Sequence, residues 1–193
     1  FWTATSSSGW VDGGTDNDQV LFLGGDLDRI NQPVPDFVAI RYNTALHRYE
    51  FTSLIWDIAN QEFLRDTPNG PFTQTYTYYQ AFNIERTVID TRAGDDEVHG
   101  DPGYQFPQTE SEWGIAPGDF EQRALIAALE IYGGDGNDTL YGGAYNDIID
   151  GGSGLDFILC GDGDDQISGG DGDDLLAGGG ESAGDFTSLP PDA

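Results

Sequence analysis

The chain has 193 residues, of which 35 are acidic and 7 are basic, and its formal net charge at pH 7 is −28. This charge repels the phosphates of nucleic acids and anionic membranes, and it opposes a compact fold unless counter-ions bind. Hydrophobic residues make up 37% of the chain and aromatic residues 12%, too many for a chain that is disordered throughout. We therefore expect a folded protein that binds cations, with no nucleic-acid partner and no insertion into a membrane.

The first elements along the chain are two irregular repeats. Residues 13–21 (GGTDNDQVL) and 23–31 (LGGDLDRIN) each combine glycines with an aspartate and, two positions later, an apolar residue. The aspartates are Asp18 and Asp28, and the apolar residues are Val20 and Ile30. We interpret residues 1–31 as degenerate copies of a nine-residue unit that becomes regular further along the chain.

Residues 32–88 have a different character. Three stretches are rich in β-branched and aromatic residues, and NQPVP and DTPNGP interrupt them with turn-forming residues. This pattern predicts β-hairpins inserted after the first repeats. The stretches are FVAIRYN (37–43), HRYEFTSLIWDI (47–58) and FTQTYTYYQAFNIERTVI (72–89).

The nine-residue phase resumes at residue 89. In TRAGDDEVH (91–99), Asp96 and Val98 take the positions of the aspartate and the apolar residue. A further unit begins at Gly100 but is interrupted by an excursion over 104–130, and the phase returns afterwards. Within the excursion, residues 119–130 favour a short helix, and a strand through 124–132 (ALIAALEIY) is the alternative. The preserved phase predicts that the turn of Asp96 stacks directly beneath that of Asp138, so that their two carboxylates share one cation.

Five uninterrupted nonapeptides occupy residues 133–177. Each has aspartate at position six and an aliphatic residue at position eight. The aspartates are Asp138, Asp147, Asp156, Asp165 and Asp174, and the aliphatic residues are Leu140, Ile149, Ile158, Ile167 and Leu176. A sixth unit (178–186) has Ala183 in place of aspartate, as expected of a terminal repeat, and 187–193 reads as a linker. We therefore assign residues 89–186 to one repeat domain that includes the excursion.

The recurrence of glycine with aspartate has a physical explanation. Two nonapeptides make one coil of a roll, but one aliphatic side chain per nine residues, at roughly 25 cal/mol per Å² buried, does not offset the entropy of ordering them. Stacked turns bring carboxylates within about 4.8 Å, where they repel unless a cation lies between them. Glycine lets the turn carbonyls face the same gap. Six or more hard oxygen ligands are what calcium prefers, so the repeats predict several calcium sites.

This pattern resembles the nonapeptide of the RTX (repeats-in-toxin) family. The resemblance is strongest over 133–177, clear over 91–103 and loose over 13–31. It implies an all-β, calcium-loaded parallel β-roll, here with inserted β-hairpins and one short helix. Calcium would lie between a turn and the next turn on the same side, which aligns Asp138, Asp156 and Asp174 on one side and Asp147 with Asp165 on the other.

Other ligands follow from the same resemblance. Asp96, Asp18 and Asp28 would add carboxylates. Tyr145 and Cys160 stand where the family pattern has glycine, so the Tyr145 turn departs most from it. The backbone carbonyls that would complete the sites are those of Gly134, Gly136, Gly152, Gly154, Gly161, Gly163, Gly170 and Gly172.

The family resemblance also bears on function. It implies a bacterial protein that is secreted or exposed on the cell surface and that folds on extracellular calcium. The chain has neither HExxH nor GxSxG, so we predict a non-catalytic structural module in adhesion or extracellular matrix assembly. Cell-surface glycans and other copies of the parent protein are the expected partners. The alternative is an accessory RTX domain of a secreted polysaccharide-acting enzyme, or a carbohydrate-binding module.

Overall fold

A computed structural model describes most of the repeat region and parts of the N-terminal half. Fifteen strands are present among the described residues, and no helix there is long and apolar enough to cross a membrane. The described residues are 9–13, 15, 17–24, 32–43, 48–54, 56–57, 62–63, 76–100 and 128–178.

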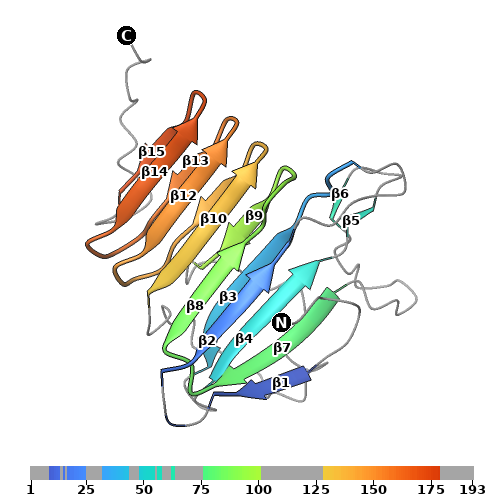
Figure 1. The fold of residues 1–193 in the computed structure, drawn as a ribbon, viewed down its shortest axis with the longest axis vertical. Coiled ribbons are helices and arrows are strands. Elements are labelled where there is room, and N and C mark those ends of the chain that lie inside the picture. Colours follow the sequence, from blue (N-terminus) through green and yellow to red (C-terminus); the bar gives the residue numbers. More distant parts are fainter. Residues whose placement is uncertain are drawn as a thin grey trace.

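Two parallel sheets face each other and form the roll (Figure 1). One is a five-stranded sheet in the order β14-β12-β10-β8-β2, in which every pair is parallel. Its strands in chain order are β2 (Gln19–Leu23), β8 (Arg86–Asp90), β10 (Leu129–Asp135), β12 (Ile148–Ser153) and β14 (Gln166–Asp171). The facing run is also parallel and consists of β3 (Phe37–Asn43), β9 (Glu97–His99), β11 (Thr139–Tyr141), β13 (Phe157–Leu159) and β15 (Leu175–Ala177).

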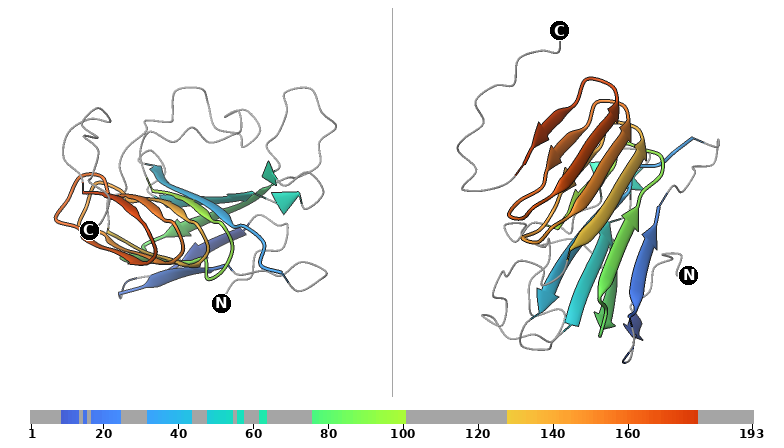
Figure 2. Two further views of the ribbon diagram at one scale, coloured as in Figure 1. Left: turned by 90° about the horizontal axis from the view of Figure 1, so that it is seen from above. Right: turned by 60° about the vertical axis from the view of Figure 1, so that its left-hand side comes forward.

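The chain alternates between the two sheets, so each pair of strands forms one coil, and successive coils nest when viewed end-on (Figure 2). Leu140 lies in register with Val98 on one side and Ile158 on the other. Because β9 pairs directly with β11, the excursion between β9 and β10 does not interrupt the stack. The expected stacking of the Asp96 turn against the Asp138 turn is therefore what the structure has.

The hairpins extend one of the two sheets. β4 (Arg48–Leu54) pairs antiparallel with β3 and with β7 (Tyr76–Phe82), and β1 (Gly9–Asp12) pairs parallel with β7. The sheet thus has eight strands in the order β1-β7-β4-β3-β9-β11-β13-β15. A separate two-stranded sheet joins β5 (Trp56–Asp57) to β6 (Glu62–Phe63). The hairpins are therefore continuous with the roll, because β3 is both a strand of the roll and the first strand of the hairpins.

The core changes character along the roll. Around the hairpins it includes the aromatic side chains of Tyr49 and Phe51, together with Ile40, Ala81 and Ile84. Through the middle coils it narrows to the position-eight residues, which are fully buried in both sheets: Val98, Leu140 and Ile158 facing Ile89, Ile131 and Ile149. In the last coil Ile167 and Leu176 are only half-buried.

Two sequence-based predictions need correction. Residues 119–127 of the expected helix lie outside the described residues, but Leu129 and Glu130 begin strand β10, so the strand alternative is correct there. The alternating burial of β10 explains this, since its inward side chains pack in the core while the outward ones face solvent. In the first repeat, Phe22 rather than Val20 is in register with Ile89. The phase of residues 13–21 is therefore two positions away from that of the later coils.

Candidate metal centre

Aspartates from five successive coils form a column along one side of the roll, at the turns that lead from the five-stranded sheet to the eight-stranded one. We call this the first column. Each aspartate's backbone N–H donates to Oδ1 of the next aspartate, for example from Asp96 to Asp138 at 2.8 Å and from Asp138 to Asp156 at 2.9 Å. The members of the first column are Asp36, Asp96, Asp138, Asp156 and Asp174.

The second carboxylate oxygen has a different environment. Asp96, Asp138 and Asp156 are at most 2% exposed. Their Oδ2 atoms are buried and have no hydrogen-bond partner. The pKa of the Asp96 carboxyl is raised to about 8 and that of Asp138 to about 7, mainly by burial and to a smaller extent by neighbouring carboxylates, while backbone hydrogen bonds oppose the shift. Three buried, unpaired oxygens of this kind are costly unless a cation or a proton neutralises them.

Glycines hold the first-column turns in a shape that brings backbone carbonyls next to these carboxylates. Gly136 and Gly154 have φ of 138° and 139°, a region that only glycine adopts readily. A Cβ on Gly154 would also clash with the carbonyl oxygen of Gly136 in the preceding coil. The glycine is therefore required both by its own φ and by the close stacking of the coils. All eight glycines named from the sequence as carbonyl donors have positive φ.

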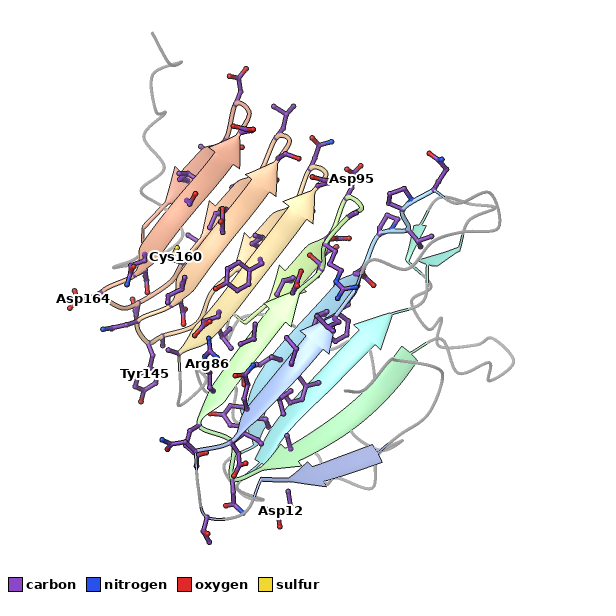
Figure 3. All side chains as sticks on the ribbon, viewed as in Figure 1. Asp12, Arg86, Asp95, Tyr145, Cys160 and Asp164 are labelled. Carbon is purple, nitrogen blue, oxygen red and sulfur yellow. The ribbon has the colours of Figure 1, made fainter. Side chains whose placement is uncertain are left out.

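A second, shorter column lies at the opposite end of the strands, where Asp147 N–H donates to Asp165 Oδ1 at 2.9 Å. Figure 3 shows the separation: Asp95 marks the first-column end, whereas Tyr145 and Asp164 mark the other. Both oxygens of Asp147 accept backbone hydrogen bonds, Oδ1 from Leu129 at 2.7 Å and Oδ2 from Gly143 at 2.6 Å. Burial raises the pKa of Asp147 to about 6, and these two hydrogen bonds oppose the shift.

The second column is limited by its neighbours. In the preceding coil, Leu129 stands in register where Asp147 stands in the next one, and its side chain is buried. Tyr145 replaces the glycine expected in the Asp147 turn, and no positive φ occurs between residues 142 and 147. This is the departure expected from the sequence at Tyr145. At the other turn, Oδ2 of Asp165 is buried without a partner, so the column offers one unsatisfied carboxylate rather than two.

The two aspartates of the N-terminal repeats have separate outcomes. Asp18 lies beside the turn before β8, and its N–H donates to Glu85 Oε2 at 2.8 Å. Its Oδ2 is buried without a hydrogen-bond partner. The N–H of Asp18 thus pairs with a glutamate rather than with an aspartate of the second column, and the role of Asp18 as a ligand stays a prediction. Asp28 lies outside the described residues.

Sequence reasoning missed Asp36, which the structure places in the first column. Pro33 and Pro35 precede it, and no glycine pattern occurs before it at the usual spacing. The available signal was the spacing of Asp36 and Val38, which matches that of positions six and eight. Val38 is in fact in register with Val98 and fully buried.

The donor chemistry of the first column fits calcium. Among the described residues no three His, Cys, Asp or Glu side chains gather as a metal cluster, so any site must combine carboxylates with backbone carbonyls. The first column supplies both, and all of these atoms are hard oxygen donors, the type that calcium prefers. The buried, unpartnered Oδ2 atoms of Asp96, Asp138 and Asp156 are the observation that a bound cation would explain.

Comparison with known families agrees with this geometry. Residues 132–166 and 161–182 match the model of the RTX calcium-binding nonapeptide repeat. No curated protein and no solved structure matches the chain. The protein therefore carries RTX calcium-binding repeats folded as a parallel β-roll, a type of repeat typical of secreted bacterial proteins.

Proposed function

We propose that this RTX module is a non-catalytic, calcium-folded part of a secreted or cell-surface bacterial protein that acts in adhesion or extracellular matrix assembly. The observation that supports calcium-driven folding most directly is the run of buried, unpartnered carboxylate oxygens at Asp96, Asp138 and Asp156. Calcium is abundant outside cells, and oxygen-rich sites of extracellular modules bind it with a Kd on the order of 10⁻⁴ to 10⁻³ M. Export before folding would follow from the higher calcium concentration outside the cell.

Charge supports the same proposal. With a net charge of −28, the compact state pays a large self-repulsion that bound divalent cations reduce. Among the side chains described in the repeat coils from residue 129 to 178, no lysine or arginine is available to neutralise the buried carboxylates. Calcium would supply the positive charge that the sequence of these coils lacks, and its binding free energy would then contribute directly to folding.

A calcium titration of the whole chain tests the calcium-driven folding. We expect circular dichroism to show little β-structure in the repeats after decalcification, and a cooperative gain as calcium rises through the millimolar range. Magnesium at the same concentration is the matched control, because it prefers near-octahedral sites and dehydrates reluctantly. A spectrum that is β-rich and identical with and without calcium would overturn the proposal.

The adhesive role needs its own experiment. We expect the calcium-loaded module to bind a glycan array or to associate with itself, and to leave polysaccharide substrates intact. Turnover of a polysaccharide that requires calcium and the folded chain would favour the enzyme alternative instead.

A further inference from the structure

The turn between β2 and β3 lies outside the residues that match the RTX repeat model. It nevertheless occupies the first column. The N–H of Asp36 donates to Asp96 Oδ1 at 2.7 Å, and the N–H of Glu97 donates to the Asp36 carbonyl at 2.9 Å. The corresponding bonds one coil on run from Asp96 to Asp138 and from Thr139 to the Asp96 carbonyl, both at 2.8 Å. Asp36 thus makes the backbone contacts of a position-six aspartate.

Two further atoms in the described part of this turn take places that correspond to those in the RTX turns. In those turns Oδ2 of the aspartate occupies the place where a Cβ on the position-one glycine would lie, as Asp138 does at Gly133. Asp36 Oδ2 lies in the same place at Gly24. The Val34 carbonyl oxygen lies 2.9 Å from a Cβ built on Gly94, and so it faces the next coil in the manner of a position-four glycine carbonyl. The turn therefore presents a carboxylate and a carbonyl oxygen to the Asp96 coil.

The sequence conceals this equivalence. Gly24 and Asp36 are twelve positions apart, whereas Gly133 and Asp138 are five apart. A longer connection between β2 and β3 costs little, because closure entropy grows only with the logarithm of loop length. Pro35 immediately precedes Asp36, so a search for the glycine-rich pattern does not find the turn.

An independent observation at Asp96, in the coil next to the Asp36 turn, points to a ligand. Asp96 is 2% exposed, and its Oδ2 is buried with no hydrogen-bond partner. Its Oδ1 is the atom that accepts the Asp36 N–H, so the carboxylate of Asp96 is oriented by the Asp36 turn itself. One oxygen is satisfied by that turn and the other is left for a cation.

We propose that a calcium ion binds between the Asp36 turn and the Asp96 turn, held by these two carboxylates and the Val34 carbonyl, at a site that no RTX motif encodes. This inference rests on the proposed function, because it assumes that the first column binds calcium at all. The proposed site extends calcium binding in the first column to a turn outside the RTX repeats. The hairpins that follow β3 would then be anchored to the roll through this ion.

The test is the number of calcium ions that the whole chain binds at saturation, measured by equilibrium dialysis for the wild type and for Asp36→Asn. Asparagine keeps the size of the side chain and removes its charge. We expect Asp36→Asn to bind one ion fewer. The matched control is Asp95→Asn, which removes a charge at an exposed position of the adjacent turn and should leave the number unchanged. If Asp36→Asn binds as many ions as the wild type, the site does not exist; if the wild type itself binds none, the proposed function fails as well.

A second measurement does not depend on the folding of a variant. In crystals of the calcium-loaded wild type, anomalous scattering should give a peak between the carboxylates of Asp36 and Asp96, in line with peaks between Asp138 and Asp156. Peaks at the latter positions with none between Asp36 and Asp96 would overturn the inference while leaving the proposed function intact.

Discussion

The two ends of the roll are stabilised in different ways. At the hairpin end, aromatic and aliphatic side chains such as Tyr49, Phe51 and Ile40 are buried in a broad core between the sheets. At the repeat end, each strand contributes one inward aliphatic side chain, and in the last coil Ile167 and Leu176 are only half-buried. Carboxylates fill the turns instead, with Asp138 and Asp156 at most 2% exposed. The first end can fold by apolar burial, whereas the second needs its buried charge neutralised.

This difference explains how one continuous sheet can contain two kinds of folding unit. Strands are paired at both ends, antiparallel among β3, β4 and β7 and parallel among β9, β11, β13 and β15. The sheet is continuous between the two ends, because β3 also pairs with β9. What differs between the ends is the kind of side chain that is buried: apolar side chains between the sheets at the hairpin end, and carboxylates in the turns at the repeat end. Local stability can therefore differ within one domain.

The largest loss of stability at the repeat end is expected from adding a methyl group at a turn glycine. Gly154→Ala forces a side chain onto a φ of 139° and against the Gly136 carbonyl, which should lower the free energy of unfolding by at least about 2 kcal/mol. Gly178→Ala is the control, because its φ is not positive and the nearest atom to its Cβ is Ile167 Cδ1 at 3.9 Å. Urea denaturation in saturating calcium measures both. Equal stability of the two variants would mean that close stacking does not limit the repeat end.

The next largest effect is a difference in calcium binding between two aspartates of the first column. Asp156 is hydrogen-bonded to the coils on both sides, whereas Asp174 contacts a described coil on one side only. Asp156→Ala should therefore remove or weaken two calcium sites and Asp174→Ala only one, because ligands are shared between adjacent turns. Isothermal calorimetry gives the number of sites in each variant. Equal losses would contradict the stacking of sites between consecutive coils.

A smaller effect concerns pH in the calcium-free protein. The folded-state pKa values of Asp96, Asp138 and Asp147 are raised from 3.8 to about 8, 7 and 6, with burial as the first cause. A carboxyl whose pKa is raised on folding contributes stability below its unfolded pKa and loses it as pH rises through the folded value. Without calcium, the repeat end should therefore become less stable as pH rises from 4 to 8.

The β-structure of decalcified protein at pH 5 and pH 8, compared by circular dichroism, checks this sign, and more of it should be present at pH 5. Asp138→Asn should reduce the dependence on pH, whereas Asp173→Asn, at an exposed position, should not. With calcium present the trend should reverse, since calcium binds the ionised carboxylates. Greater stability at pH 8 than at pH 5 without calcium would show that these groups are not protonated in the folded state.

The sequence predicted the repeat end far better than the hairpin end. Each repeat couples one aliphatic residue to one aspartate at fixed spacing, so the register of Leu140 with Val98 could be anticipated across the excursion. Asp36 was missed because it lies twelve positions after Gly24 instead of five, and stacking depends on where the strands resume rather than on the length of the turn. Val20 was misplaced because β2 carries two inward apolar residues, and only pairing with β8 decides which one faces Ile89.

The sequence assigned the two columns of aspartate to opposite sides of the roll, but it did not predict that their carboxylates differ in hydrogen bonding. Asp138 and Asp147 have the same position in their repeats, yet Asp147 is satisfied by two backbone N–H groups while Asp138 keeps an unpaired oxygen. The difference arises from Leu129 in the preceding coil and from the turn conformation at Tyr145. The stacking of Leu129 against the Asp147 turn is not encoded in the spacing of the repeats, whereas the departure at Tyr145 was expected from the sequence.

The central claim is that calcium holds the repeat end while apolar burial holds the hairpin end. Amide hydrogen exchange, followed by mass spectrometry before and after decalcification, tests it most directly. We expect protection to be lost in β11, β13 and β15 and retained in β3, β4 and β7. Loss of protection at both ends together, or retention at both, would contradict the account.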